Sequence, residues 1–475
     1  MHKLLNAFLL TISISAFAQE STAPKIHGAD IYGAKPNRPF LYKIPATGAK
    51  PMEYSVIGLP QGLTLDKNTG IISGISPAKN NYSTQLIAKN NFGADTLTFD
   101  IKVGDELSLT PAMGWNSWNV FGLRVTDKDI RNAADVMVST GLIDHGWGYI
   151  NIDDGWESEE RKPDGEIATN SKFPDLTALS DYIHSKGLKF GIYSSPGSRT
   201  CGGFLGSLNH EEQDIKTYEK WGVDYLKYDL CSYTVRTFLV KKNLQKPYIY
   251  MNQFIQNSNR DIVYSLCQYG LGKVWKWGKE VGGNSWRTTG DIVDTWASVN
   301  RLLNKQKKLS AYASPGHWND PDMLVLGVVG WNNDSRKCRL TEAEQQLHFG
   351  MWSMLASPLL LGCDLTKIDS FTMSLITNDD IIALNQDRLG KQAAFVYERE
   401  DIQVWSKPLA DGSTAVGIIN LGTKEKTTSV KLDKISSTQY STSKNLWNKQ
   451  ISTIKDNTIT ATIPSHGIVQ FKLSK

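Results

Sequence analysis

Short runs that alternate apolar and polar residues follow one another after residue 18, with glycine and other turn residues between them. This period of two is typical of β-strands that are buried on one face. The runs span residues 40–44, 53–57, 70–73, 83–88 and 96–103. We therefore predict a small Ig-like β-module over residues 19–105. None of its side chains suggests chemistry, so we expect it to act as a spacer or a docking module.

The pattern changes at about residue 106, where short apolar runs begin to alternate with longer amphipathic stretches. The short runs predict strands at residues 149–152, 190–193, 225–228, 262–266 and 354–361, and the long ones predict helices at 127–139, 176–186, 211–221 and 292–303. Repeated strand–helix units up to residue 390 suit an α/β fold, a (β/α)8 TIM barrel, whose typical length is about 250 residues. A doubly wound open sheet is the alternative, but residues 114–117 do not supply its glycine-rich phosphate turn.

The last stretch, residues 391–475, returns to strand-like alternation. Its runs span residues 402–406, 414–420, 427–432, 458–463 and 468–473, with Gly412, Gly422 and Gly467 as punctuation. This pattern predicts a C-terminal antiparallel β-sandwich that packs against the barrel.

Composition narrows the functions that this architecture could serve. The 475 residues carry a net charge of only +4, and Lys and Arg form no basic stripe, so we expect no nucleic-acid partner. Five Cys are too few for a disulfide scaffold, and neither Cys nor His residues show zinc-ligand spacing, so we expect no metal and no cofactor. Cys201 and Cys231 each follow a predicted strand and are the pair that we expect to form a disulfide.

The first 18 residues have the pattern of a secretory signal peptide. Lys3 gives a positive start, residues 4–14 are largely apolar, and Ala16-Phe17-Ala18 forms a small-x-small cleavage site. We therefore expect export to the periplasm or the medium. No other stretch reaches the roughly 18 uninterrupted apolar residues that a membrane helix needs, so we expect no membrane insertion.

Carboxylates and tryptophans gather directly after the predicted strands of the barrel, where the catalytic groups of such barrels lie. The segments are Asp153-Asp154-Gly155-Trp156, Tyr193-Ser194-Ser195, Lys227-Tyr228-Asp229, Arg287 to Asp291 and Trp318 to Asp322. One aspartate at a strand end is usually a helix N-cap, and one tryptophan is more often core than binding site. Independent caps would not cluster with tryptophan at successive strand ends, so we interpret the group as a functional site.

Hydrolysis of a glycosidic bond explains this group. One acid must protonate the leaving oxygen while a second carboxylate attacks the sugar or activates a water molecule. Aromatic faces and hydrogen-bonding side chains then hold the sugar ring. The residue types therefore predict a glycoside hydrolase.

Five motifs, in order along the chain, resemble glycoside hydrolase family 27, the family of the α-galactosidases and the α-N-acetylgalactosaminidases. They are Met113-Gly114-Trp115-Asn116-Ser117-Trp118, Asp153-Asp154-Gly155-Trp156, Lys227-Tyr228-Asp229, Trp286-Arg287 with Asp291, and Trp318-Asn319-Asp320-Pro321-Asp322. The resemblance covers the barrel and the sandwich. Residues 59–93 separately resemble the immunoglobulin-like domains attached to many secreted hydrolases.

The resemblance implies a retaining exo-glycosidase that removes terminal α-D-galactose from a galactose-containing oligosaccharide or polysaccharide. Asp229 would be the nucleophile that forms a covalent glycosyl-enzyme, and Asp291 would be the acid that later serves as base. The residues implied to bind the sugar or line its pocket are Trp115, Asp153, Asp154, Tyr193, Cys201, Lys227, Gln268 and Arg287. The family also has a disulfide near its nucleophile, at the positions of Cys201 and Cys231.

Some of these implied roles are specific. Trp115 would form the apolar floor of the pocket. Asp153 and Asp154 would bind the outer hydroxyls of the sugar, those at the 4- and 6-positions. Arg287 would contact the hydroxyl next to the reacting carbon.

Lys227 lies two residues before Asp229, so on a strand both side chains point to the same face. A nearby cation favours the ionised form of a carboxyl group, and we expect Lys227 to support a charged Asp229. A retaining mechanism needs the two catalytic carboxyl groups roughly 5–5.5 Å apart, whereas an inverting one needs about 6.5–9.5 Å. Retention is here implied by the resemblance.

One segment departs from the family pattern, at two neighbouring positions. Many members have Cys-Glu-Trp after the fifth strand, with the Glu reaching the 2-hydroxyl, whereas this chain has Cys267-Gln268-Tyr269. Gln can still donate to and accept from a hydroxyl, and its length argues against an α-N-acetylgalactosaminidase, which has small residues there. A β-L-arabinopyranosidase is a further alternative, ranked lower because the Asp153-Asp154 pair leaves room to hold an O6.

Two alternatives of other classes are open. A sugar-binding barrel without catalysis predicts the loss of one catalytic aspartate, but both are present in the sequence. A metal-dependent hydrolase predicts further hard ligands beside the carboxylates, which instead alternate with tryptophans.

Overall fold

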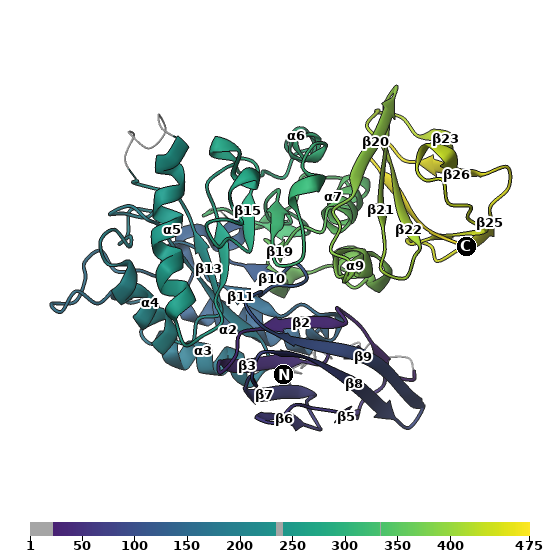
Figure 1. Cartoon of the computed structure of the whole chain (residues 1–475). Coiled ribbons are helices and arrows are strands. Elements are labelled where there is room, and N and C mark those ends of the chain that lie inside the picture. The colour runs from purple at the N-terminus through teal and green to yellow at the C-terminus, as the bar shows by residue number, and fades with distance from the viewer. Residues whose placement is uncertain (1–21, 234–240, 333) are drawn as a thin grey trace, which may run out of the picture.

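The computed structural model describes residues 22–233, 241–332 and 334–475. It contains an N-terminal β-module, a barrel and a C-terminal sheet domain, in that order along the chain (Figure 1). The predicted signal peptide at residues 1–18 lies outside the described residues. Within those ranges, no helix combines the length and the apolar character needed to cross a membrane.

The N-terminal module consists of two small sheets and one short strand pair. The first sheet has the order β2 (Ile31–Ala34), β9 (Gly93–Val103), β8 (Asn80–Asn90), β5 (Glu53–Ile57), and the second has the order β3 (Pro39–Lys43), β7 (Ile71–Ile75), β6 (Leu63–Asp66). β1 (Lys25–Ile26) pairs with β4 (Ala46–Thr47). Alternate residues of β8 and β9, such as Leu86 and Phe99, point into one apolar core because side chains alternate along a strand. The predicted Ig-like module is confirmed.

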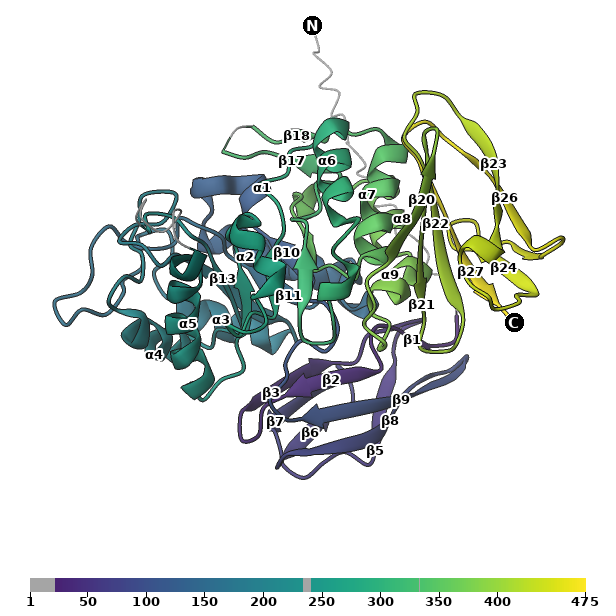
Figure 2. The same ribbon diagram turned by 45° about the horizontal axis from the view of Figure 1, so that its top comes forward.

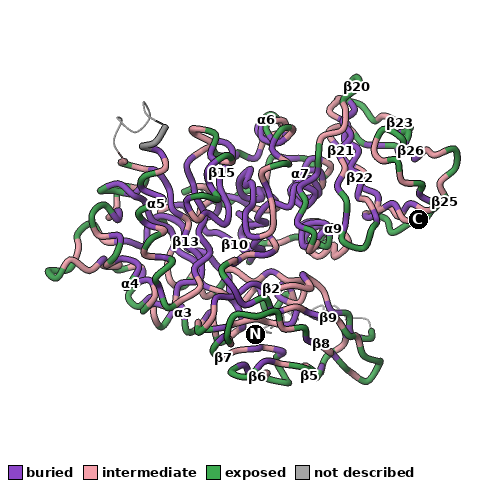
Figure 3. Tube along the Cα trace, in the orientation of Figure 1, coloured by how far each residue is buried: buried purple, intermediate pink, exposed green. Residues whose placement is uncertain are grey.

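Eight short parallel strands form the curled sheet of the barrel. In sheet order they are β16 (Trp318–Asp320), β15 (Ser285–Arg287), β14 (Val263–Leu266), β13 (Tyr225–Tyr228), β12 (Lys189–Ser194), β11 (Tyr149–Asn151), β10 (Met113–Asn116) and β19 (Leu359–Leu361). A parallel bridge between Leu324 and Leu361 links the segment after β16 to β19. The strands are almost entirely buried (Figure 3), which explains why several of them, such as β14 and β19, are largely apolar in sequence. The TIM-barrel prediction is confirmed.

Helices connect the strands and cover the outside of the sheet. The longer ones are α2 (Asp127–Ser139), α3 (Leu176–Ser185), α4 (Glu211–Lys220), α5 (Lys241–Asn257), α6 (Trp296–Gln306) and α7 (Glu342–Met354). The first three match the predicted ranges to within one residue. α6 begins four residues later than predicted, because Thr295 is its N-cap and accepts a hydrogen bond from the Ser298 amide.

One strand prediction was half wrong, and two of the six longer helices, α5 and α7, were not predicted. The run at 354–361 is a strand only from Leu359, since α7 continues to Met354. α7 is buried on nearly all sides, so it lacks the amphipathic period by which a surface helix is recognised. α5 contains Pro247, a residue that argues against a helix interior.

The C-terminal domain packs beside the barrel as an antiparallel sheet domain, as predicted. Its main sheet has the order β20 (Ala394–Arg399), β21 (Ile402–Pro408), β22 (Thr414–Asn420), β27 (Ile468–Ser474), β24 (Thr442–Asn445), β25 (Ile451–Thr453), and β23 (Lys426–Lys431) pairs with β26 (Thr458–Ile463). α7 contacts β22 and β27, which joins this domain to the barrel (Figure 2).

The N-terminal module covers the end of the barrel at which the strands begin (Figure 2). The Lys35 amide donates to Asp261 Oδ2 at 3.0 Å, two residues before β14. The Lys189 ammonium, on the first residue of β12, contacts the Tyr32 hydroxyl. The opposite end, where the strands finish, is therefore left free by this module.

Asp224 fixes the start of β13, the strand that leads to Asp229. Its carboxylate accepts hydrogen bonds from the Phe190 amide at 2.8 Å and from Arg260 at 2.7 Å, and it pairs with His184 at 2.7 Å. Burial opposes ionisation, but His184 and Arg260 outweigh it and lower the pKa of Asp224 to about 2. The ionised carboxylate is thus a stabilising group of the folded state.

We expect Asp224→Asn to lower the free energy of unfolding by about 2–4 kcal/mol at neutral pH, since it removes a buried charge partner. Because the folded pKa lies below the unfolded value of about 3.9, this stability is present above pH 4 and is lost between pH 4 and pH 2. Urea unfolding as a function of pH measures it. Equal unfolding midpoints for the variant and the wild type at pH 7 would contradict the prediction.

Candidate active site

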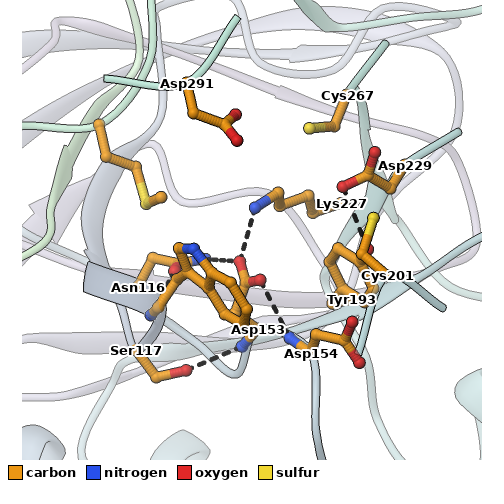
Figure 4. A network of polar contacts seen from close by, with 12 residues as sticks. Asn116, Ser117, Asp153, Asp154, Tyr193, Cys201, Lys227, Asp229, Cys267 and Asp291 are labelled. Carbon is orange, nitrogen blue, oxygen red and sulfur yellow. Dashed lines mark hydrogen bonds and ion pairs between the residues drawn. The ribbon is translucent and has the colours of Figure 1, made fainter. Parts of the chain in front are cut away.

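The barrel brings most of the predicted site residues together at the ends of its strands, and Figure 4 shows Asp153, Asp154, Tyr193, Cys201, Lys227, Asp229 and Asp291 side by side. Trp115 lies on β10, Asp153 and Asp154 follow β11, Tyr193 lies on β12, Lys227 and Asp229 lie on and just after β13, Gln268 follows β14, and Arg287 lies on β15 with Asp291 in the next loop. This convergence follows from the parallel order of the strands, whose carboxyl ends share one face of the barrel.

Asp229 is buried, and both of its carboxylate oxygens accept hydrogen bonds. Oδ1 accepts from the Tyr269 hydroxyl at 2.6 Å and from the Leu230 amide at 2.8 Å, while Oδ2 accepts from the Tyr193 hydroxyl at 3.1 Å. Burial raises the pKa of Asp229 above its ordinary value, whereas Lys227 and the Tyr269 hydrogen bond act in the opposite direction. Lys227 therefore supports ionisation as expected, but it does not outweigh burial.

The ammonium group of Lys227 is bound to Asp153. Lys227 Nζ lies 2.7 Å from Asp153 Oδ2, and the Asn116 amide nitrogen donates to the same oxygen at 2.9 Å. The backbone amide of Asp153 donates to Ser117 Oγ at 2.9 Å, and Oδ1 accepts from the Asp154 amide at 3.0 Å. Asp153 is thus held rigidly, which gives Asn116 and Ser117 of the first motif a role that the sequence did not reveal.

Asp154 has one oxygen engaged and one free. Oδ2 accepts from the Gly202 amide at 2.6 Å, whereas buried Oδ1 has no hydrogen-bond partner among the described residues. Burial raises the pKa of Asp154 to about 6. An unpaired buried acceptor is costly unless a ligand group supplies the missing donor. Asp154 Oδ1 is therefore an acceptor that a ligand hydroxyl could satisfy.

Cys201 and Cys231 form the predicted disulfide, which joins the loops that follow β12 and β13. Their sulfurs lie 3.8 and 3.9 Å from the Tyr269 hydroxyl. The two cysteines and Asp229 lie close enough to hold a metal ion, but cysteines in a disulfide offer no thiolate ligand. The disulfide therefore lies beside Asp229 and Tyr269 as a fixed, uncharged neighbour.

Arg287 is buried and is shared by two carboxylates. Its Nη2 lies 3.0 Å from Asp291 Oδ1 and 2.8 Å from Asp322 Oδ2. Asp322 also accepts a hydrogen bond from the Ile292 amide at 2.8 Å, which orders the loop that carries Asp291. The Asp291 side chain is 70% exposed, and Figure 4 shows its carboxyl group directed toward the cluster around Lys227. Asp291 thus meets solvent at the mouth of the site.

Trp115 and Gln268 are fully buried. The Trp115 indole donates to the Cys363 carbonyl at 2.7 Å, which fixes the ring. Neither amide atom of Gln268 has a hydrogen-bond partner among the described residues. Both oxygen and nitrogen of this amide are thus available to a ligand, in keeping with its predicted position near the sugar.

Two residues contact predicted site residues, although nothing in the sequence indicated these contacts. Tyr269 was read only as a departure from a family motif, yet it makes the shortest hydrogen bond to Asp229. Asp322 was noted within a motif but given no role, yet it positions Arg287 and the Asp291 loop. Each contact joins two residues that are far apart in the sequence, so neither residue could be recognised from its own segment.

Sequence profiles of known families match three parts of the chain. The family described as "Alpha galactosidase A" matches residues 110–387. "Alpha galactosidase C-terminal beta sandwich domain" matches residues 399–473, and "Putative Ig domain" matches residues 25–104. The three matches follow the three parts of the observed fold.

Known proteins resemble the chain over most of its length. The α-galactosidase of Cyamopsis tetragonoloba is 39% identical over 397 residues, which cover 82% of this chain and 93% of that protein. A solved protein of Bacteroides fragilis, described as a "putative alpha-galactosidase/melibiase", is 38% identical, has a TM-score of 0.92 and is matched over 96% of this chain and 98% of its own. The α-galactosidase of Saccharomyces cerevisiae, solved with raffinose, is 28% identical with a TM-score of 0.69, over 77% and 98% of the two chains.

The contribution of the Cys201–Cys231 disulfide to stability can be tested directly. We expect the double variant Cys201→Ser/Cys231→Ser to lose about 2–4 kcal/mol of unfolding free energy, because a cross-link over 30 residues restricts the unfolded chain. Urea unfolding measures the loss. Cys338→Ser, which alters an unpaired cysteine, is the matched control. If the double variant and this control unfold at the same urea concentration, the disulfide is not formed in solution.

Proposed function

The chain belongs to glycoside hydrolase family 27, and on that premise we propose that Asp229 and Asp291 are the catalytic pair of an α-galactosidase. The enzyme hydrolyses terminal α-D-galactosyl residues. The observation that carries the assignment is the buried Asp229 carboxylate, held by three donors beside Lys227, with Asp291 directed toward the same space (Figure 4).

The two carboxyl groups divide the reaction between them. In the first half, an oxygen of Asp229 attacks the anomeric carbon, the bond to the leaving oxygen breaks, and Asp291 supplies the proton to that oxygen. In the second half, water attacks the anomeric carbon, Asp291 takes a proton from the water, and the electron pair returns to Asp229. Two displacements at one carbon retain its configuration.

The environments of the two aspartates suit these roles. Asp229 is 4% exposed and shielded from water, so its charge is available only to the sugar and its fixed donors. Asp291 is exposed and can exchange protons with solvent, as a group that acts first as acid and then as base must. Arg287 holds Asp291 at the mouth without covering it.

The remaining site residues would bind the galactosyl ring. The free oxygen of Asp154 would accept from an outer hydroxyl, with Asp153 beside it. Trp115 would pack under the ring's C–H face, and the unpaired amide of Gln268 would meet the 2-hydroxyl. We propose a galactose-containing oligosaccharide or polysaccharide as substrate, and export by the peptide at residues 1–18.

A release assay with three substrates tests the proposed chemistry. The p-nitrophenyl α-D-galactopyranoside should turn over faster than the α-N-acetylgalactosaminide and the β-L-arabinopyranoside. Asp229→Ala should lower kcat by about 10⁴-fold or more, as expected for loss of a nucleophile. Asp291→Ala should retain more activity on this substrate, because p-nitrophenolate leaves without a proton.

The same assay separates the alternatives. Preference for the arabinoside or the acetamido sugar would refute the assigned use of Gln268 and Asp154 but leave the aspartates in place. An active Asp229→Ala variant would refute the nucleophile. The configuration of the first sugar product, followed by NMR, should be α.

Export has its own test. Expression of the full chain in a bacterial host should give a mature protein whose N-terminal residue is Gln19, because the small-x-small site ends at Ala18. N-terminal sequencing of the periplasmic and medium fractions measures this. A chain found uncleaved in the cytoplasm would contradict the signal-peptide assignment.

A further inference from the structure

Tyr269 occupies an unusual turn directly after β14. Its φ is 64°, in the left-handed region, and Gly270 follows with φ of 80°. A Cβ at Gly270 would lie 2.2 Å from the Thr288 carbonyl oxygen, so only glycine fits there. Left-handed backbone at a non-glycine residue costs about 1 kcal/mol or more and persists where the surroundings fix it. The turn directs the phenol of Tyr269 toward Asp229.

The Tyr269 hydroxyl makes the two oxygens of Asp229 unequal. Oδ1 accepts two short hydrogen bonds, from Tyr269 at 2.6 Å and from the Leu230 amide at 2.8 Å. Oδ2 accepts one longer hydrogen bond, from Tyr193 at 3.1 Å. A carboxylate oxygen with fewer and longer hydrogen bonds keeps more of its charge available for bonding.

The ring of Tyr269 is also held in place. Arg287 lies over it, with the guanidinium carbon 5.9 Å from the ring centroid. The sulfurs of Cys201 and Cys231 lie next to its hydroxyl. A donor fixed on several sides needs no reorganisation when charge develops on its partner.

We propose that Tyr269 is a positioning residue that selects Oδ2 of Asp229 as the attacking oxygen and stabilises Oδ1 as the carboxylate leaves the sugar in the second half-reaction. This inference rests on the proposed nucleophile. It concerns a residue at which the chain departs from the Cys-Glu-Trp pattern of many family members.

The charge on Asp229 changes in opposite directions in the two half-reactions. In the first, a full carboxylate loses charge as Oδ2 bonds to the anomeric carbon, so the Tyr269 hydrogen bond weakens toward the transition state. In the second, the Oδ2–carbon bond breaks, its electron pair returns to the carboxylate, and the water proton goes to Asp291. The hydrogen bond to Oδ1 strengthens in this step and lowers its barrier.

Tyr269→Phe removes the hydroxyl and keeps the ring. We expect kcat for p-nitrophenyl α-D-galactopyranoside to fall by about tenfold to a hundredfold, the range for loss of a hydrogen bond to a charged group, whereas kcat/KM should not fall at pH values above its acid limb. The glycosyl-enzyme should accumulate. A burst of p-nitrophenolate and a hexosyl adduct in the intact mass of the acid-quenched protein would show it.

A pH profile gives an independent readout. The Tyr269 hydrogen bond lowers the pKa of Asp229, so its removal raises that pKa. Asp229 must be ionised to attack, and the acid limb of kcat/KM should therefore move to higher pH in the variant. A merely structural role for Tyr269 would not move this limb.

Tyr248→Phe is the matched control. The Tyr248 hydroxyl donates to the main-chain oxygen of Asp229 at 3.1 Å and does not touch the carboxylate. This variant should show neither a burst nor a shifted limb. Equal falls in kcat and kcat/KM without a burst in Tyr269→Phe, or a burst in both variants, would overturn the proposal.

Failure of the proposed function would look different. An adduct mapped by peptide mass spectrometry to a residue other than Asp229 would remove the nucleophile assignment itself. An adduct on Asp229 whose amount is the same in wild type and Tyr269→Phe would leave the nucleophile in place and overturn only the role of Tyr269.

Discussion

The site depends on two cations, the buried Arg287 and the partly buried Lys227, that allow many carboxylates to share one end of the barrel. Lys227 pairs with Asp153, and Arg287 pairs with Asp322 and Asp291. Ionised carboxylates removed from water are costly unless paired, and the two cations do not neutralise all of them. The pKa of Asp320, like that of Asp154, is consequently raised by burial to about 6. Carboxyl groups are thus concentrated at the end of the barrel where the sugar must bind.

The two flanking domains leave open the end of the barrel at which the strands finish. The N-terminal module binds at the strand starts through Lys35 and Tyr32, and the C-terminal sheet packs against α7 at the side. Among the residues that the structure describes, neither domain supplies a hydrogen-bonding group to Asp229. Both domains cover surface of the barrel away from the cluster around Asp229.

The sequence allowed the barrel, the sandwich and the strand-end aspartates to be predicted, because apolar period and strand-end position are local properties. The helix α7 was missed since burial on all sides removes its amphipathic period. The contacts of Tyr269 with Asp229 and of Asp322 with Arg287 were missed for a different reason. Tyr269 reaches the Asp229 carboxylate through a left-handed turn, and Asp322 reaches Arg287 from the loop after β16, so neither contact has a signature in one stretch of sequence.

The Gln268-Tyr269 pair fits this balance of charge. A glutamate at 268 would add another buried carboxylate to a cluster that Lys227 and Arg287 already fail to neutralise, and its desolvation would raise pKa values further. A neutral amide keeps a donor and an acceptor at no such cost. Tyr269 then adds a hydrogen-bond donor to Asp229 from the same turn, and the Arg287 guanidinium lies over its ring. The two departures therefore act together: one spares the site a negative charge, and the other stabilises the negative charge on which catalysis depends.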